Sequence, residues 1–144
     1  MAAPSITFHH RDVPDAFRHR GRLRRWLKRV AREHGLEVHE LAFVLMTDAE
    51  LLEYNQRYLG HDTLTDVITF DGQTGTGVSG DVLMSYDRIR ENAREYGTSA
   101  QRELHRVMVH GLLHLLGQRD KTEAQRKAMR GEEDRWLAVL DRLQ

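Results

Sequence analysis

The sequence contains no cysteine and only two prolines among its 144 residues. Without cysteine the chain can form no disulfide, no thiolate metal site and no cysteine nucleophile, so any metal must be bound through histidine, carboxylate or water. No apolar run approaches the roughly 20 residues that a transmembrane helix needs, and the start MAAPSITFHH lacks the basic-then-apolar layout of a signal peptide. We therefore expect a cytoplasmic protein with no membrane partner.

Charge of one sign is not in excess, because 22 basic residues balance 22 acidic ones. The basic residues are nevertheless concentrated early in the chain. Helical spacing there predicts a basic ridge that is either a solvated face or a contact surface for RNA; its members are Arg18, Arg22, Arg25, Arg29 and Arg32. The length and a hydrophobic content of 40% predict one domain with one core over residues 1–144.

The pattern of apolar residues predicts four strands and five helices. The strands are expected over residues 5–9, 37–46, 65–71 and 81–86, and the helices over 14–33, 48–58, 88–96, 99–116 and from 123 nearly to the end. The expected N-terminal caps are Thr47, Asp87, Thr98 and Thr122. The expected core residues are Leu23, Trp26, Leu27 and Val30 in the first helix, Leu51, Leu52, Tyr54 and Tyr58 in the second, and Trp136 in the last.

This order of elements predicts a mixed α+β (α/β) fold, with a small mixed sheet of about four strands packed against about five helices. The glycine-rich stretch GQTGTGVSG, residues 72–80, lies between the last two predicted strands. It lacks the lysine and the following helix of a P-loop, so a hairpin connection is the better interpretation.

The stretch HGLLHLLGQRD, residues 110–120, predicts a metal site. Residues four apart share one helix face, so His110 and His114 can both reach a single ion. Gly117 permits a left-handed helix end, after which the chain can return Asp120 to the same ion. A histidine pair alone is usually coincidental, but the glycine and the third donor serve the same geometry and favour a metal helix like that of zincins.

Metzincin proteases share this spacing, but there a glutamate follows the first histidine and acts as the general base. Gly111 occupies that position here, so peptide hydrolysis by that mechanism lacks its proton acceptor. A metallopeptidase is therefore the least favoured function.

The residues from His110 to Gly117, read with TDVITF (residues 65–70) and GDV (residues 80–82), resemble the YbeY family of bacterial metal-dependent endoribonucleases. The resemblance implies a single-strand-specific endoribonuclease that acts in maturation of the 16S ribosomal RNA 3′ end and in ribosome quality control. It also implies one zinc ion held by His110, His114 and Asp120, ribosomal RNA and the small ribosomal subunit as partners, and no DNA substrate.

The sequence departs from the family pattern at two positions. Asp120 stands where the family has a third histidine; a carboxylate is an accepted zinc ligand, but its charge leaves the metal's identity more open. Leu59 stands where the family has an arginine thought to contact RNA, and Arg57, two residues earlier, would point elsewhere on a helix. We therefore assign no RNA-binding residue.

The residues alone also allow a protein that does not cleave RNA. A non-catalytic ribosome assembly factor would use the metal structurally, for which a fourth ligand such as His61 would be needed. The general base is unassigned, with Asp66, Asp71 and Asp81 as candidates. Glu103 lies two turns before His110 and is either a hydrogen-bond partner of a histidine or, as we favour, an ordinary surface carboxylate.

Overall fold

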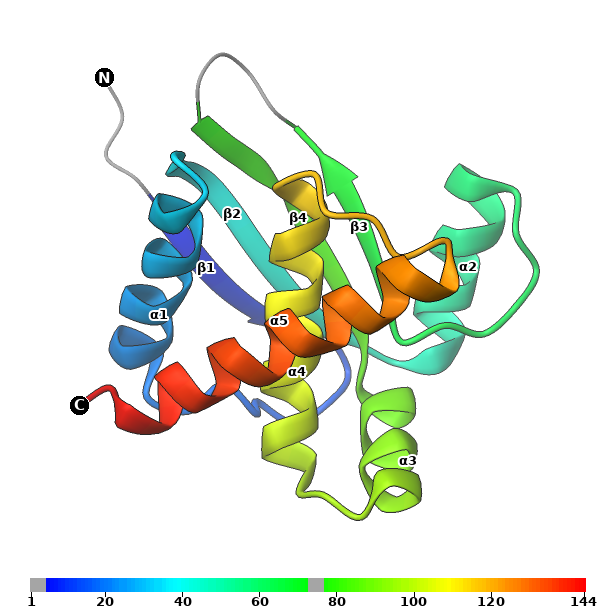
Figure 1. The fold of residues 1–144 in the computed structure, drawn as a ribbon. Coiled ribbons are helices and arrows are strands. Elements are labelled where there is room, and N and C mark those ends of the chain that lie inside the picture. The colour runs from blue at the N-terminus through cyan, green and yellow to red at the C-terminus, as the bar shows by residue number, and fades with distance from the viewer. Residues whose placement is uncertain (1–4, 73–76) are drawn as a thin grey trace.

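The computed structural model describes residues 5–72 and 77–144, and Figure 1 shows the arrangement of its elements. In this part of the chain the predicted mixed α+β fold with four strands and five helices is confirmed. The elements are β1 (Ser5–His10), α1 (Arg20–Glu33), β2 (Glu37–Met46), α2 (Asp48–Leu59), β3 (Val67–Asp71), β4 (Gly77–Ser85), α3 (Tyr86–Tyr96), α4 (Ala100–Leu115) and α5 (Glu123–Arg142).

The four strands form one sheet in the order β1-β2-β4-β3. β1, β2 and β4 run parallel, whereas β3 pairs antiparallel with β4 as the edge strand. The predicted hairpin between β3 and β4 is confirmed by this pairing, although residues 73–76 of its connection lie outside the described residues. β4 begins at Gly77, four residues earlier than the sequence predicts.

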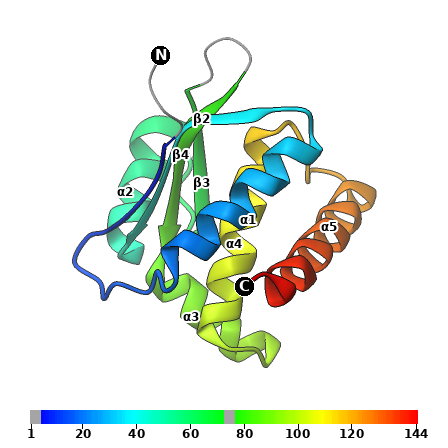
Figure 2. The same ribbon diagram turned by 90° about the vertical axis from the view of Figure 1, so that its left-hand side faces the viewer.

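The helices cover the two faces of the sheet unequally. Figure 2 shows α2 on one side and α1, α4 and α5 on the other. Successive residues of a strand point to opposite faces, so Val82 meets α4 at Gly111, whereas the next residue, Leu83, packs with Leu51 of α2. The larger of the two apolar clusters lies on the side of the three helices.

The core confirms most of the predicted buried residues. Trp26 and Trp136 are both buried, and the Trp26 indole donates a hydrogen bond to the Trp136 carbonyl at 2.8 Å, which joins α1 to α5. Leu52 and Tyr54 are half-buried. Tyr58 is 58% exposed and stacks on Tyr54 with ring centroids 5.7 Å apart. The prediction of Tyr58 as a core residue is wrong.

The predicted start of the first helix is also wrong, because α1 begins at Arg20 and not near Pro14. The carboxylate of Asp15 accepts a hydrogen bond from the Phe17 backbone N–H at 3.0 Å and binds Arg20 at 2.9 Å, which holds a turn at this position. Phe17 is buried against Phe8, with ring centroids 5.2 Å apart. The chain therefore buries this aromatic side chain here and does not form the first turns of the expected helix.

Two of the four predicted caps are correct. Thr47 accepts from the Glu50 N–H at 3.2 Å, and Thr122 forms a complete capping box with Gln125. The other two are displaced, since Ser85 caps α3 in place of Asp87, and Ser99 caps α4 in place of Thr98.

Within residues 5–72 and 77–144, none of the helices combines the length and the apolar composition needed to cross a membrane.

Candidate metal centre

The two histidines of the predicted metal site lie one above the other on the last turns of α4. Their ring centroids are 4.7 Å apart, as expected for residues four apart on one helix face. The helix is amphipathic, and its other residues in this stretch, among them Leu112, Leu113 and Leu115, are buried in the core. Packing of this apolar side against the sheet leaves the histidine side partly open to solvent.

The chain turns back directly after α4, which confirms the left-handed helix end predicted at Gly117. Gly117 has a φ of +100°, which a glycine adopts without a steric penalty. Its N–H binds the His114 carbonyl at 3.0 Å, and the next N–H, that of Gln118, binds the Leu113 carbonyl at 3.0 Å. These are the two hydrogen bonds of a Schellman motif, and they direct the following residues toward the histidine face.

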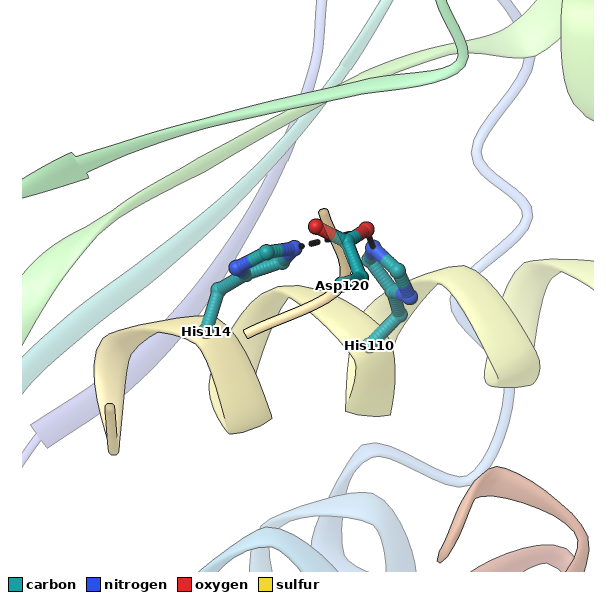
Figure 3. A group of neighbouring side chains, drawn as sticks. All are labelled: His110, His114 and Asp120. Atoms are coloured by element: carbon teal, nitrogen blue, oxygen red, sulfur yellow. Dashed lines mark ion pairs between the residues drawn. The ribbon is translucent and has the colours of Figure 1, made fainter. Parts of the chain in front are cut away.

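Asp120 is returned to the two histidines by this turn (Figure 3). Its Oδ2 atom lies 3.4 Å from His110 Nε2 and 3.2 Å from His114 Nε2. One potential ligand atom from each residue lies within 4.8 Å of the others. The side chains are 21%, 29% and 32% exposed for His110, His114 and Asp120, so the cluster is accessible from solvent.

Glu133 on α5 holds the other side of the His110 ring. His110 Nδ1 and Glu133 Oε2 are 2.6 Å apart, and Glu133 is only 5% exposed. Arg106 donates to the second oxygen, Oε1, at 2.9 Å. Burial alone would lower the pKa of His110, but the hydrogen bond and the charge of Glu133 raise the pKa above its ordinary value.

These contacts fit a divalent metal. A proton on Nδ1, donated to Glu133, leaves the lone pair of His110 on Nε2, the nitrogen that faces Asp120 and His114. A carboxylate that orients a metal-binding histidine in this way is a common feature of zinc sites. Two imidazole nitrogens and one carboxylate oxygen are also a donor set that zinc accepts.

Gly111 permits the close approach of α4 to the sheet. A Cβ atom at this position would lie 2.5 Å from Cγ1 of Val82 on β4. A side chain larger than that of glycine at this position would therefore clash with β4 unless the helix or the strand shifted.

Three carboxylates were considered as general bases, and Asp66 is the one that shares a cleft with the cluster. It lines the same cleft as His110 and Asp120, and its burial raises its pKa above the ordinary value against the opposing charge of His110. Asp81 opens onto the other face of the sheet, in a pocket that it shares with His9. Asp71 is exposed at the end of β3.

The prediction that Glu103 is an ordinary surface carboxylate is wrong. It is 4% exposed, and its Oε1 atom lies 4.0 Å from Arg106 Nε. Burial raises the pKa of Glu103 to about 7 despite the charge of Arg106. The partner of His110 is Glu133 instead, which sequence reasoning missed because only the docking of α5 on α4 brings the two together.

His61, the suggested fourth ligand, is exposed in the segment after α2. Among the described residues it does not belong to the group that could hold one ion. Arg57 points along α2 and binds Glu53 at 3.2 Å.

The predicted basic ridge is partly used in the fold. Arg22 donates to the Leu143 carbonyl at 3.0 Å and also to the Leu140 carbonyl, and Arg25 donates to the Gln144 carbonyl. Arg18 precedes α1 and does not share its face. Arg22 and Arg25 therefore anchor the end of the chain after α5, and Arg32 lies 3.8 Å from a Glu37 oxygen in an ion pair.

Comparison with known proteins identifies relatives along nearly the whole chain. The family model described as "Endoribonuclease YbeY" matches residues 6–141. A protein of that name from Cytophaga hutchinsonii is 38% identical over 140 residues, which cover 96% of this chain and 98% of the relative. Another from Phocaeicola vulgatus is 44% identical over 115 residues, which cover 80% and 83% of the two chains.

A solved structure has the same fold. The solution structure of a protein from Thermotoga maritima aligns with a TM-score of 0.62 over 94% of this chain and 89% of its own, at 23% sequence identity. The family model and the two relatives therefore place the chain in one family, and the solved structure shows the same fold. The chain belongs to the endoribonuclease YbeY family.

Proposed function

We propose that this protein is a metal-dependent endoribonuclease that cleaves single-stranded regions of ribosomal RNA. Its membership of the endoribonuclease YbeY family supports this reaction. The observation that carries the proposal is the convergence of His110, His114 and Asp120 at one point, with Glu133 behind His110. Residues 1–144 would act as one metal-dependent hydrolase domain.

The proposed cofactor is one zinc ion per chain, held by His110, His114 and Asp120. A structural zinc site usually has four protein ligands, whereas a catalytic site has three and leaves one position for water or substrate. Three candidate ligands are present among the described residues, which favours a catalytic ion over a structural one. A bound divalent ion would polarise a phosphodiester oxygen and lower the pKa of water at the cleavage site.

The surrounding residues prepare the cluster for this chemistry. Glu133 holds the His110 ring by its Nδ1 atom, so that Nε2 is directed at Asp120. Arg106 compensates the buried charge of Glu133 and also binds Asp134, at 2.6 Å. Of the three carboxylates considered as general bases, Asp66 is the one that lines this cleft, and we propose it as the proton acceptor.

The proposed substrate is the 3′ end of 16S ribosomal RNA on the small ribosomal subunit in the cytoplasm, as the family resemblance implies. RNA presents a negatively charged backbone, and the arginines that line the cleft beside the cluster supply positive charge for it.

Metal analysis and RNA cleavage together test the proposal. Purified wild type is compared with His114→Ala, Asp120→Ala and the control His61→Ala, first for zinc content and then for cleavage of a structured fragment of 16S ribosomal RNA. We expect near-stoichiometric zinc and cleavage in wild type and His61→Ala, and loss of both in the other two variants. A wild-type protein that binds zinc but cleaves no RNA, even on the small subunit, would instead indicate an assembly factor with a structural metal.

A further inference from the structure

A cleft of about 560 Å³ extends from the metal-binding cluster between α3, α4 and α5. Its volume lies within the range of roughly 300–1,000 Å³ that is typical of ligand-binding pockets. His110 and Arg102 both line it and are eight residues apart on α4, which corresponds to about 12 Å along the helix axis. The cleft can therefore hold more of a substrate than the group that contacts the ion.

Tyr96 forms one wall of this cleft at the end of α3. It is 59% exposed, so a ligand in the cleft can reach the face of its ring. The Arg130 guanidinium of α5 lies 5.9 Å from the centre of its ring. An aromatic ring beside an arginine is the arrangement on which an unpaired nucleobase stacks in proteins that bind single-stranded RNA.

Two arginines of α5 carry positive charge at the same cleft. Arg126 and Arg130 are four residues apart on one helix face, and neither forms an ion pair with a carboxylate in the described part of the chain. Arg126 donates only to the Lys121 carbonyl, at 2.8 Å. Two like charges at this spacing repel each other, and an anion between them would relieve the repulsion.

The acidic groups of the cleft are less negative than their number suggests. Arg106 binds both Glu133 and Asp134, so its positive charge offsets part of their negative charge. Burial also raises the pKa of Glu103 to about 7. The positive charges of Arg126 and Arg130 therefore remain available to a ligand.

We propose that Tyr96, Arg126 and Arg130 form a nucleotide subsite of this enzyme. Tyr96 stacks on an unpaired base, and the two arginines bind phosphates of the same single strand that reaches His110, His114 and Asp120. The subsite would favour unpaired RNA because the face of a base is accessible only outside a helical stack. This inference rests on the proposed RNA substrate, and it adds how the strand is held beside the cluster.

Fluorescence anisotropy of metal-supplemented protein with a labelled single-stranded RNA of about 12 nucleotides tests the subsite, with probe integrity checked on a gel. We expect Tyr96→Leu to weaken binding about 10-fold and Tyr96→Phe to bind nearly as wild type, because stacking needs the ring and not the hydroxyl. An abasic strand of the same length should bind Tyr96→Leu and wild type alike.

Arg130→Ala should also weaken binding and should reduce the slope of log K against log salt by about 0.7, the value for one phosphate contact on a single strand. Its matched control is Arg90→Ala, because Arg90 also lies over a tyrosine, 5.3 Å from the Tyr86 ring centre, but lines a different pocket. The control loses the same charge and should keep nearly wild-type affinity.

The outcomes separate the subsite from the proposed activity. Unchanged RNA affinity in Tyr96→Leu, or equal losses in Arg130→Ala and Arg90→Ala, would overturn the subsite even where wild type cleaves RNA. An equal loss of affinity for the abasic and the normal strand in Tyr96→Leu would also overturn it, since the ring would then act only on the fold. Binding that depends on Tyr96 and Arg130 in a protein without nuclease activity would overturn the proposed function and retain the subsite.

Discussion

Glu133 has an effect on His110 that its position in the sequence does not reveal. It is a buried carboxylate between two hydrogen-bond donors, with His110 Nδ1 at 2.6 Å and Arg106 at 2.9 Å. Arg106 compensates the charge that burial would otherwise disfavour. The carboxylate can therefore stay ionised and keep the imidazole in the orientation and tautomer that a metal requires.

We predict that Glu133→Gln weakens zinc binding by about 10- to 100-fold, the usual effect of losing a carboxylate behind a metal-binding histidine. The measurement is a competition titration against a chromogenic chelator, which needs no RNA. Glu132→Gln is the matched control, because this neighbouring side chain is half-buried and the hydrogen bond to His110 is made by Glu133. Equal zinc affinities for the two variants would show that Glu133 does not orient His110.

His105 is the residue from which we expect the clearest effect of pH on stability. Burial lowers its pKa to about 4, helped by the charges of Arg22 and Arg102, whereas an unfolded chain has the ordinary value near 6.5. The folded state therefore keeps His105 neutral while the unfolded state takes up a proton as the pH falls below 6.5. This residue lowers the free energy of unfolding progressively between pH 6.5 and pH 4.

We predict that, from pH 7.5 to pH 5, wild type loses roughly 2 kcal/mol of unfolding free energy relative to His105→Gln. The comparison of the two proteins cancels the other titrating groups, and urea unfolding at several pH values measures it. A difference between the proteins that stays constant with pH would mean that His105 titrates normally in the folded state.

The role of a residue could be predicted from the sequence when its partners lie close to it in the chain. His110, His114 and Asp120 lie within eleven residues, so helix geometry and one glycine are enough to suggest that they meet. Glu133 and Glu103 acquire their environments only when α5 and the sheet pack on α4. No local pattern distinguishes either of them from an exposed glutamate such as Glu123 of α5.

At the scale of elements, the contact of α4 with β4 determines where the histidines stand. The helix approaches so closely that a methyl group at Gly111 would lie 2.5 Å from Val82, which is fully buried. The glycine thus sets the distance between the histidine-bearing face of α4 and the sheet.

We predict that Gly111→Ala destabilises the protein by about 1–3 kcal/mol, the range for overpacking a core, although alanine favours a helix more than glycine does. Gly131→Ala on α5 is the matched control, because no atom outside its own helix lies within 4 Å of the added methyl group. The control should raise stability by up to about 1 kcal/mol.

The double variant Gly111→Ala with Val82→Ala adds a second check by urea unfolding. Removal of the valine methyl groups makes room for the new one, so the two changes together should cost less than the sum of the single changes. Strict additivity would show that the loss in Gly111→Ala has another origin.

The existence of each element was predictable, but its first residue often was not. Ser85 and Ser99 cap their helices in place of Asp87 and Thr98, each within two residues of the prediction. Neighbouring residues of similar capping ability compete, and tertiary contacts decide between them. Asp87, for example, accepts a hydrogen bond from the backbone N–H of Asp48 at 2.8 Å and so joins α3 to α2.

For the molecule as a whole, the cluster connects the end of α4, the turn after it and, through Glu133, the middle of α5. A ligand that binds only the folded state stabilises it, by about 2.7 kcal/mol when its free concentration is 100 times its Kd. We predict that zinc at this concentration raises the Tm of wild type by about 10 °C.

Thermal unfolding with and without a chelator measures this shift. It should be absent in His114→Ala and preserved in His61→Ala, whose exposed imidazole lies outside the cluster. A shift that persists in His114→Ala would place the zinc elsewhere on the protein.

The Glu133–His110 hydrogen bond also determines when the site can mature as the chain is synthesised. All three candidate ligands leave the ribosome before Glu133 does, because they lie between residues 110 and 120. A nascent chain that ends between Asp120 and Glu133 has its ligands but lacks the carboxylate that orients the first of them. The cluster would thus reach its full affinity for zinc only after α5 has folded back onto α4.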